Sequence, residues 1–385
     1  MARAPIYLDC HATTPVDPAV LEVMLPYFTE AFGNPASASH AWGWKAQEAV
    51  ERARREVAAL LGAQAREVVF TSGATESNNL AIQGAADAAP PERRHLAVSA
   101  IEHPSVLAAA DRLGAAGWRV SVVPVHADGR LDMDALAAVV DARTALVSVM
   151  AANNEIGVLQ PLDAIARLAH EAGALLHVDA AQAAAKVPID VHATGIDLLS
   201  VTAHKFYGPK GCGALFVRKG LRLPPILVGG GQERGVRAGT LNVPGIVGLG
   251  AASAIGREGL AAEAARVGAL RDRLLEGLQS RLDGVTVNGS MAHRLPHNLH
   301  VSFAGVDGAQ LLVSISDIAV SSGSACCSAS ATPSHVLAAI MGERAMTDAS
   351  IRFGLGRFTG VEDVEYAIER FATVVGHLRR VGAVG

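Results

Sequence analysis

The sequence predicts an α/β fold, in which a mostly parallel seven-stranded sheet carries helices on both faces and a smaller α+β domain lies beside it. From about residue 45 to 255, short apolar runs alternate with helix-length segments, and Gly or Pro stands between them. After Gly248 the composition shifts to a long charged helical segment. The alternation is typical of an open parallel sheet, in which ligands bind at the carboxyl ends of the strands.

Seven short apolar segments predict the strands of the large sheet. They are residues 67–71, 95–99, 119–125, 145–150, 174–179, 196–202 and 213–217. Segments of helical length lie between several of them, at 77–88, 105–117, 133–141 and 162–173. Parallel neighbours need such crossover connections, so most of the seven strands are expected to be parallel.

The C-terminal third of the chain predicts the smaller domain. A helix is expected over residues 253–282, where Ala, Leu and Arg recur at helical spacing. Short strands are expected at 285–288, 298–303 and 319–321, and helices at 334–341 and 361–379. We expect residues 16–255 to form the large domain, and residues 1–15 and 256–385 to form the small one.

The composition argues against several classes of protein. The 33 basic and 37 acidic side chains leave a net charge of -4, which argues against nucleic acid or an anionic membrane as a partner. The four cysteines form no C-x-x-C pair, which argues against a disulfide scaffold and a structural zinc site. No apolar stretch approaches the roughly 18–20 residues of a membrane span, and residues 1–10 lack the apolar run of a signal peptide. We expect a soluble cytoplasmic protein.

Lys205 is the lysine whose position points to chemistry. It closely follows the apolar segment 196–202, and a Gly-Pro turn comes soon after it. At the carboxyl end of a buried strand, desolvation lowers the pKa of an amine toward that of a usable nucleophile. The alternative is a loop lysine that caps the end of a strand. Three other lysines lie in polar or loop contexts and are expected in solvent: Lys45, Lys186 and Lys219.

A buried lysine of this kind suggests pyridoxal phosphate, which also needs a phosphate cradle, a carboxylate at the ring nitrogen and a flat group against the ring. Residues 71–76 (TSGATE) lead from a strand into a helix, where free backbone N–H groups bind anions. Asp179 ends the strand at 174–179, and a protonated pyridine nitrogen would satisfy its buried carboxylate. His103 follows the strand at 95–99 and can stack on a ring.

Asn154 and Gln182 complete six candidates at the ends of five strands. Asn154 follows the strand at 145–150, and Gln182 comes three residues after Asp179. Each candidate also has an ordinary structural explanation. Residues 71–76 can be a simple strand-to-helix turn, Asp179 a helix cap or salt-bridge partner, and His103 a loop histidine. One pocket would account for all six, and we therefore favour a pocket.

Cys326 is a candidate nucleophile. It lies in a run of Ser, Gly and Ala at 321–331 that lacks the large apolar residues of a core, and this predicts a mobile, exposed loop. Cys327 follows it directly. The alternatives are two small residues in a tight turn, or a disulfide between adjacent cysteines.

Nine segments, taken together, resemble the motifs of one enzyme family. They are YLDCHATTPVD at 7–17, FGNPASAS at 32–39, VFTSGATESNN at 69–79, NNEIGV at 153–158, HVDAAQ at 177–182, HKFYGPKG at 204–211, GGGQERGVRAGT at 229–240, SSGSACCSAS at 321–330 and SIRFGLGRF at 350–358. In order and spacing, from about residue 6 to 380, they resemble the cysteine desulfurases of the NifS and IscS type. These are class V pyridoxal phosphate enzymes of fold type I.

The resemblance implies a role for each cofactor-binding candidate. Lys205 would hold pyridoxal phosphate as a Schiff base, Asp179 would pair with its ring nitrogen, and His103 would stack on its ring. Gln182 would contact the phenolic oxygen. The remaining cofactor contacts would come from Ala74, Thr75, Thr202 and His204 around the phosphate, and from Asn154.

The resemblance also implies the substrate contacts and the oligomeric state. Asn154 and Arg352 would hold the substrate carboxylate, a role that suits the bidentate fork of an arginine. Thr240 would reach the phosphate of the neighbouring subunit's cofactor, which implies a homodimer.

The implied reaction converts L-cysteine to L-alanine and leaves a persulfide on Cys326. The freed amine of Lys205 would remove the Cα proton, and His103 would accept the proton of the Cys326 thiol. The sulfur would pass to an acceptor or an iron–sulfur scaffold protein, for iron–sulfur clusters or thiolated cofactors. Cys326 is also the single metal-ligand candidate, as a transient ligand of an iron–sulfur cluster.

Three positions depart from the family's pattern. His11 replaces a usual small polar residue, Gly354 replaces a frequent serine, and Cys327 replaces a frequent threonine. Two alternatives stay open: a selenocysteine lyase or another class V lyase or transaminase, and a non-catalytic partner in a sulfur-transfer complex. A transaminase needs no loop thiol, and a silent relative would be expected to lose Lys205 or Cys326.

Overall fold

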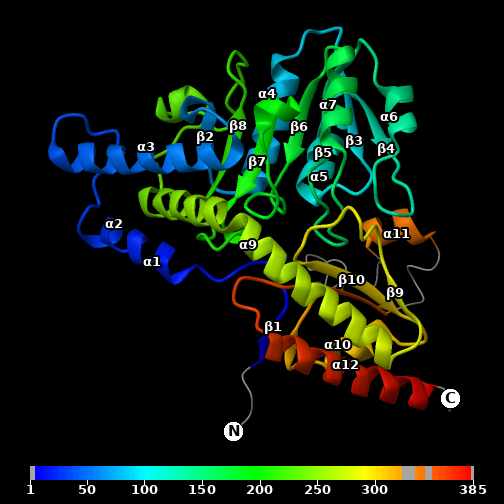
Figure 1. The fold of residues 1–385 in the computed structure, drawn as a ribbon. Coiled ribbons are helices and arrows are strands. Elements are labelled where there is room, and N and C mark those ends of the chain that lie inside the picture. The colour runs from blue at the N-terminus through cyan, green and yellow to red at the C-terminus, as the bar shows by residue number, and fades with distance from the viewer. Residues whose placement is uncertain (1–4, 323–333, 343–348, 383–385) are drawn as a thin grey trace.

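The structure is a computed structural model that describes residues 5–322, 334–342 and 349–382. Its large sheet has seven strands in the order β2-β8-β7-β6-β5-β3-β4 (Figure 1). Only β8 runs antiparallel to its neighbours, so the predicted mostly parallel sheet is confirmed. The strands are β2 (Val68–Thr71), β3 (His95–Ser99), β4 (Arg119–Val123), β5 (Thr144–Met150), β6 (Leu175–Asp179), β7 (Leu198–Thr202) and β8 (Gly213–Val217).

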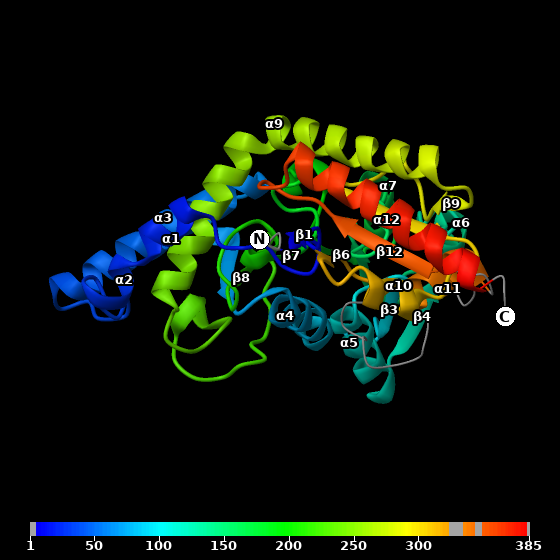
Figure 2. The same ribbon diagram turned by 90° about the horizontal axis from the view of Figure 1, so that it is seen from below.

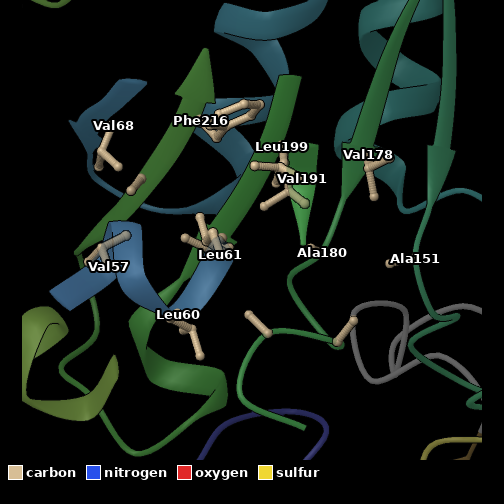
Figure 3. Close-up of a cluster of buried hydrophobic side chains, with 14 of the residues drawn as sticks. Val57, Leu60, Leu61, Val68, Ala151, Val178, Ala180, Val191, Leu199 and Phe216 are labelled. Carbon is tan, nitrogen blue, oxygen red and sulfur yellow. The ribbon is translucent and has the colours of Figure 1, made fainter. Parts of the chain in front are cut away.

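Helices cover both faces of this sheet. Val57, Leu61 and Phe216 belong to the cluster on one face, shown in Figure 3. On the other face, Leu80 and Val106 pack with the strand residues that point the opposite way. The helices of the large sheet region are α3 (Ala41–Leu61), α4 (Ala74–Ala88), α5 (Pro104–Ala115), α6 (Met133–Val139), α7 (Leu162–Glu171) and α8 (Val191–Thr194), preceded by the short α1 (Pro18–Met24) and α2 (Pro26–Thr29).

Helix α9 (Val243–Arg281) is longer than the predicted helix at 253–282 and begins ten residues earlier. The Asn242 side chain caps it by accepting the N–H of Gly245 at 3.1 Å. Its first third is rich in Gly and Ala, which hid the helical pattern. A Cβ atom on Gly250 would lie 2.6 Å from the Cα atom of Ala53, so glycine lets α9 cross close to α3.

A second core lies under the C-terminal half of α9. There Leu274 and Leu278 pack with Val301, Phe353 and neighbouring residues of a three-stranded antiparallel sheet. Figure 2 shows α12 alongside this half of α9. The elements are β9 (Val285–Val287), β10 (Asn298–Phe303), β12 (Ala349–Gly354), α10 (Gly308–Ser314), α11 (His335–Met341) and α12 (Val361–Gly382), with β1 (Ile6–Tyr7) paired to β11 (Ile318–Ala319). The domain boundary at residue 255 stays a prediction.

The strand β12 was not predicted, and the reason is its sequence. The polar residues Ser350 and Arg352 interrupt its apolar residues, so the segment does not show the continuous apolar stretch of a typical buried strand. Backbone pairing with β10 holds the arginine inside the protein, opposite His300.

The expectation that Lys186 is solvated is wrong. Its side chain is buried, with Nζ 3.2 Å from Glu263 Oε1 on α9 and 4.5 Å from the ring centroid of Tyr207. Arg357 lies 4.3 Å from the same ring and pairs with Glu263 at 2.7 Å. A buried ammonium group needs such a partner, and the small residues before Lys186 gave no sign of one.

None of the helices within the described ranges is long and apolar enough to cross a membrane.

Candidate functional site

A cavity of about 700 Å³ lies at the carboxyl ends of the large sheet's parallel strands. The turns after β3, β5, β6 and β7 and the start of α4 line it, and β12 adds one arginine from the second sheet. The cavity therefore gathers ten of the predicted site residues: Ala74, Thr75, His103, Asn154, Asp179, Gln182, Thr202, His204, Lys205 and Arg352.

Lys205 ends a short 3-10 turn, Ala203–Lys205, that follows β7 directly. Its Nζ donates hydrogen bonds to the backbone carbonyl of Ala12, at 2.9 Å, and to that of His11. The chain just after this turn is also fixed, because the Tyr207 N–H donates to the Thr14 hydroxyl at 2.8 Å. These contacts place a primary amine at the wall of the cavity.

The start of α4 forms a site suited to a phosphate group. Gly73 has φ +148°, a conformation that favours glycine, and it exposes the first-turn amides of Ala74 and Thr75. A Cβ atom on Gly213 would lie 2.6 Å from the Cα atom of Gly73, so the strand β8 can approach the turn only with a glycine there. Free amides and a helix N-terminus are what an anion requires, and they fit the phosphate of pyridoxal phosphate.

His204 completes this end of the cavity. Burial, followed by the charges of Lys205 and Lys210, lowers its pKa to about 4, so it is neutral at physiological pH. Its Nδ1 lies 3.1 Å from the Thr13 hydroxyl.

Asp179 is the carboxylate of the cavity floor. Its side chain is only 5% exposed, and both oxygens accept N–H groups. Oδ2 accepts from Asn78 Nδ2 at 2.7 Å, and Oδ1 accepts from the Ala181 backbone at 2.9 Å. A buried carboxylate held in this way suits a positively charged ring nitrogen.

The departure at His11 has a structural role. Arg294 Nη1 donates to Asn298 Oδ1 at 2.7 Å, so the amide Nδ2 of Asn298 faces His11 Nε2, at 3.0 Å, and donates to it. His11 Nδ1 therefore carries the hydrogen and donates to Gln182 Oε1 at 2.9 Å. Gln182 Nε2 donates to the His11 carbonyl at 3.0 Å, so His11 holds both ends of this amide.

Arg352 enters the cavity from β12 and is 2% exposed. Nη1 donates to the Asn154 backbone carbonyl at 2.8 Å, and Nη2 donates to Asp9 Oδ1 at 2.8 Å. Asp9 also accepts from the Ser321 hydroxyl at 2.9 Å. A guanidinium group held by two partners in a cavity is preorganised for a carboxylate.

Several residues of the site were missed by sequence reasoning. Asp9 and Glu155 lay inside quoted motifs without an assigned role, and His335 carried no signal at all. Burial raises the pKa of Glu155 to about 7, against the opposing effects of its hydrogen bond with Ser334 and the charge of Arg352.

Of the other two predicted site residues, one lies away from the cavity and one is not described by the structure. Thr240 is exposed and does not line it. Cys326, and with it Cys327, lies outside the described residues, so the predicted nucleophile and metal ligand has no structural description. In the part of the chain that is described, no group of three or more His, Cys, Asp or Glu residues is placed to hold a metal ion.

The chain resembles known proteins over nearly its whole length. The family model for Aminotransferase class-V matches residues 6–367. A relative named "Cysteine desulfurase IscS" from Anaeromyxobacter sp. (strain K) is 54% identical, with 98% of this chain and 94% of that protein covered. One of the same name from Methylococcus capsulatus (strain ATCC 33009 / NCIMB 11132 / Bath) is 51% identical, with the same coverage.

Solved structures agree with this likeness. A "NIFS-LIKE PROTEIN" superposes with a TM-score of 0.91 at 38% identity and covers 97% of this chain and 100% of its own. The structure titled "SspA in complex with cysteine" superposes with a TM-score of 0.82 at 38% identity, covering 92% of this chain and 100% of its own.

The buried Glu102 beside His103 generates a pH prediction. Burial raises its pKa to about 8, so the folded chain holds this proton more tightly than the unfolded chain does. Its contribution to stability is therefore full at low pH and is lost as the pH rises toward 8. Between about pH 5.5 and pH 8, the wild type should lose about 3 kcal/mol more unfolding free energy than Glu102→Gln.

Chemical denaturation of both proteins at the two pH values measures this difference. Glu48→Gln, which changes an exposed carboxylate on α3, is the control and should follow the wild type. Equal pH dependence of the wild type and Glu102→Gln would contradict the assignment.

Proposed function

Because the chain belongs to the class V aminotransferase family and is a cysteine desulfurase within it, we propose that the cavity at the carboxyl ends of β6 and β7 is its active site. The single observation that supports this most directly is the convergence there of Lys205, Asp179 and the N-terminus of α4. An amine, a buried carboxylate and an anion-binding turn are what pyridoxal phosphate requires.

The family implies pyridoxal phosphate, and the residues of the cavity fit it. We propose that Lys205 attaches the cofactor, Asp179 faces its ring nitrogen, His103 lies against its ring and Gln182 donates to its phenolic oxygen. The phosphate contacts are Ala74, Thr75, Thr202 and His204, and Asn154 lines the same cavity. When bound, the cofactor supplies an electron sink for the charge that develops at the substrate's Cα atom.

The chain's own residues then bind the substrate and move its proton. Arg352 and Asn154 hold the carboxylate of L-cysteine, and Asp9 keeps the guanidinium group oriented. Lys205 Nζ, once free of the cofactor, takes the proton from Cα and holds it. Lys205 lines the cavity, so its amine is available there for this step.

We propose that Cys326 is the nucleophile that receives the sulfur. Its thiolate attacks the sulfur of the substrate, and an S–S bond forms as the C–S bond breaks. The electron pair of the C–S bond stays with the substrate's Cβ atom, which takes up a proton, and L-alanine is released. The described residues that flank this part of the chain support the placement. Ser334 donates to Glu155 of the cavity wall at 2.5 Å, and Ser321 donates to Asp9 at 2.9 Å.

The persulfide sulfur goes to an acceptor. The relatives named IscS support delivery to an acceptor or scaffold protein that assembles iron–sulfur clusters or thiolated cofactors. We propose that Cys326 transiently ligates a cluster during that delivery. We also propose that the enzyme works in the cytoplasm, since its described cysteines, Cys10 and Cys212, are free.

The protein is proposed to work as a homodimer. Large apolar side chains are exposed together around α1, α2 and the start of α3, as at a subunit interface. They include Leu25, Phe28, Phe32, Trp42 and Trp44. Thr240, exposed in the isolated chain, would then reach the partner's phosphate site.

Lys205→Ala should abolish the yellow colour of the purified protein and slow alanine formation by at least about 100-fold, because the amine both attaches the cofactor and takes the proton. Absorbance spectroscopy and an alanine assay measure the two effects. Lys219→Ala, on the exposed turn after β8, should keep both. A wild-type protein that is colourless and does not bind added pyridoxal phosphate would contradict the proposal.

Cys326→Ser should keep the colour and lose sulfide release from cysteine, because the cofactor site is intact and the sulfur acceptor is gone. Cys327→Ser is the matched control and should keep the activity. Mass spectrometry after incubation with cysteine identifies which thiol carries the additional sulfur. An active Cys326→Ser protein that carries the additional sulfur on Cys327 would contradict the assignment of Cys326 and identify Cys327 as the nucleophile.

Thr240→Ala should weaken cofactor binding by about 10-fold, since a hydrogen bond to a charged phosphate is lost. Co-expression of Thr240→Ala chains with Lys205→Ala chains tests whether Thr240 serves the cofactor site of the partner subunit or that of its own subunit. If Thr240 acts across the interface, the mixed dimer keeps one intact site, and half of its sites bind cofactor with wild-type affinity. Weak binding at every remaining site would place Thr240 in its own subunit's pocket and contradict the proposal.

A further inference from the structure

The hydrogen bonds of His103 determine which of its ring nitrogens carries a hydrogen. His103 is the N-cap residue of α5, and its Nδ1 accepts the backbone N–H of Ser105 at 3.1 Å. A backbone N–H can only donate, so Nδ1 must present its lone pair. The neutral ring therefore carries its hydrogen on Nε2.

The hydroxyl of Ser105 reinforces the same arrangement. Ser105 Oγ lies 2.8 Å from His103 Nδ1 and accepts from Asn78 Nδ2 at 2.9 Å. Because Nδ1 carries no hydrogen, the hydroxyl must donate its own to Nδ1. His103 Nδ1 thus receives two hydrogen bonds, one from the backbone and one from the side chain of the same serine.

Asp179 sets the direction of this chain of hydrogen bonds. Asn78 Nδ2 also lies 2.7 Å from Asp179 Oδ2, which accepts from it. Turning the Asn78 amide over would bring its carbonyl oxygen against the carboxylate. That oxygen, Oδ1, is buried and has no hydrogen-bond partner in the described structure. The amide therefore leaves Oδ1 unpaired in order to donate toward Asp179 and Ser105.

Burial and two nearby cationic groups favour the neutral form of His103. Burial is the largest effect and lowers its pKa. Lys205, after β7, and His335, on α11, act in the same direction, while Asp179, at the end of β6, opposes them. The two hydrogen bonds to Nδ1 also favour the neutral form, since protonation of this nitrogen would break both.

We infer that Ser105 and Asn78 are positioning residues that lock His103 as the Nε2–H tautomer, so that it serves the reaction as a hydrogen-bond donor to an anionic sulfur and takes no proton. This inference rests on the proposed function of the cavity that His103 lines. Nε2 is free to donate because it has no partner among the described residues. The donor role takes the place of the proton-acceptor role implied by the resemblance.

The test replaces Ser105 and measures the tautomer and the pKa of His103. The variants are Ser105→Ala, which removes the hydroxyl, and Ser105→Thr, which restores one. Ser121→Ala is the matched control, because Ser121 Oγ lies 3.0 Å from Nε2 of a different histidine, His95. The holoenzyme is labelled with ¹⁵N-histidine, and its NMR signals report the tautomer and the pKa. Since the chain has 14 histidines, the signals of His103 are assigned by their loss in His103→Gln.

In the wild type, His103 is expected to show the Nε2–H pattern from about pH 6 to pH 8.5. Ser105→Ala should raise the pKa of His103 by about one unit, because a hydrogen bond to the neutral ring is lost. Its kcat should fall by a factor of about two to five, because the backbone N–H alone fixes the tautomer less firmly than the N–H and hydroxyl together, and the other tautomer gains population. Ser105→Thr should restore both, and Ser121→Ala should change neither.

The pH profile separates a donor from a base. If His103 only donates, the acid limb of kcat stays in place in Ser105→Ala although the pKa of His103 has risen. An acid limb that moves with that pKa would show a proton acceptor and overturn the inference, as would an Nδ1–H signal in the wild type or unchanged His103 signals in Ser105→Ala. The NMR signals need no turnover, so a wild type without desulfurase activity would overturn the proposed function separately.

Discussion

The buried carboxylate of Asp179 is the group on which the rest of the site depends. A negative charge at the floor of an apolar sheet is tolerated only with donors on both oxygens, and Asn78 and Ala181 supply them. Asn78 then donates onward to Ser105, which holds His103. The hydrogen bonds that begin at the charge of Asp179 therefore connect the end of β6 with the first turns of α4 and α5.

A second set of contacts holds the opposite wall of the cavity. His11 is fixed by Asn298 and orients Gln182, while its backbone carbonyl accepts from Lys205. Burial lowers the pKa of His11 well below its ordinary value, as it does for the neighbouring His297, which stacks on it at 4.4 Å. Each wall thus contains a neutral histidine, His103 or His11, and hydrogen-bond partners determine which of its ring nitrogens carries the hydrogen. The positive charges of the cavity come from lysine and arginine.

Much of the fold and of the site could be predicted from the sequence, because both lie in short segments whose local pattern is clear. The seven strands of the large sheet are brief apolar runs, and the candidates Lys205, Asp179 and His103 lie at the ends of such runs or within a few residues after them. Prediction failed where a residue's surroundings come from distant segments. The strand β12 was missed because Arg352 breaks its pattern, and the burial of Lys186 was missed because Glu263 lies far along the chain.

The sequence by itself determined the α/β class, the polar candidate residues that follow successive strands, and the resemblance to a family. Each of these depends on local sequence patterns. Only the tertiary structure decided which side chains meet. Asp9 joins Arg352, Asn78 joins Asp179, and His11 joins Gln182 across separations that no periodicity encodes. The physical reason is that hydrogen-bond direction and desolvation depend on neighbours brought together by folding, and these set the tautomer of His103 and lower the pKa values of His11, His103 and His204.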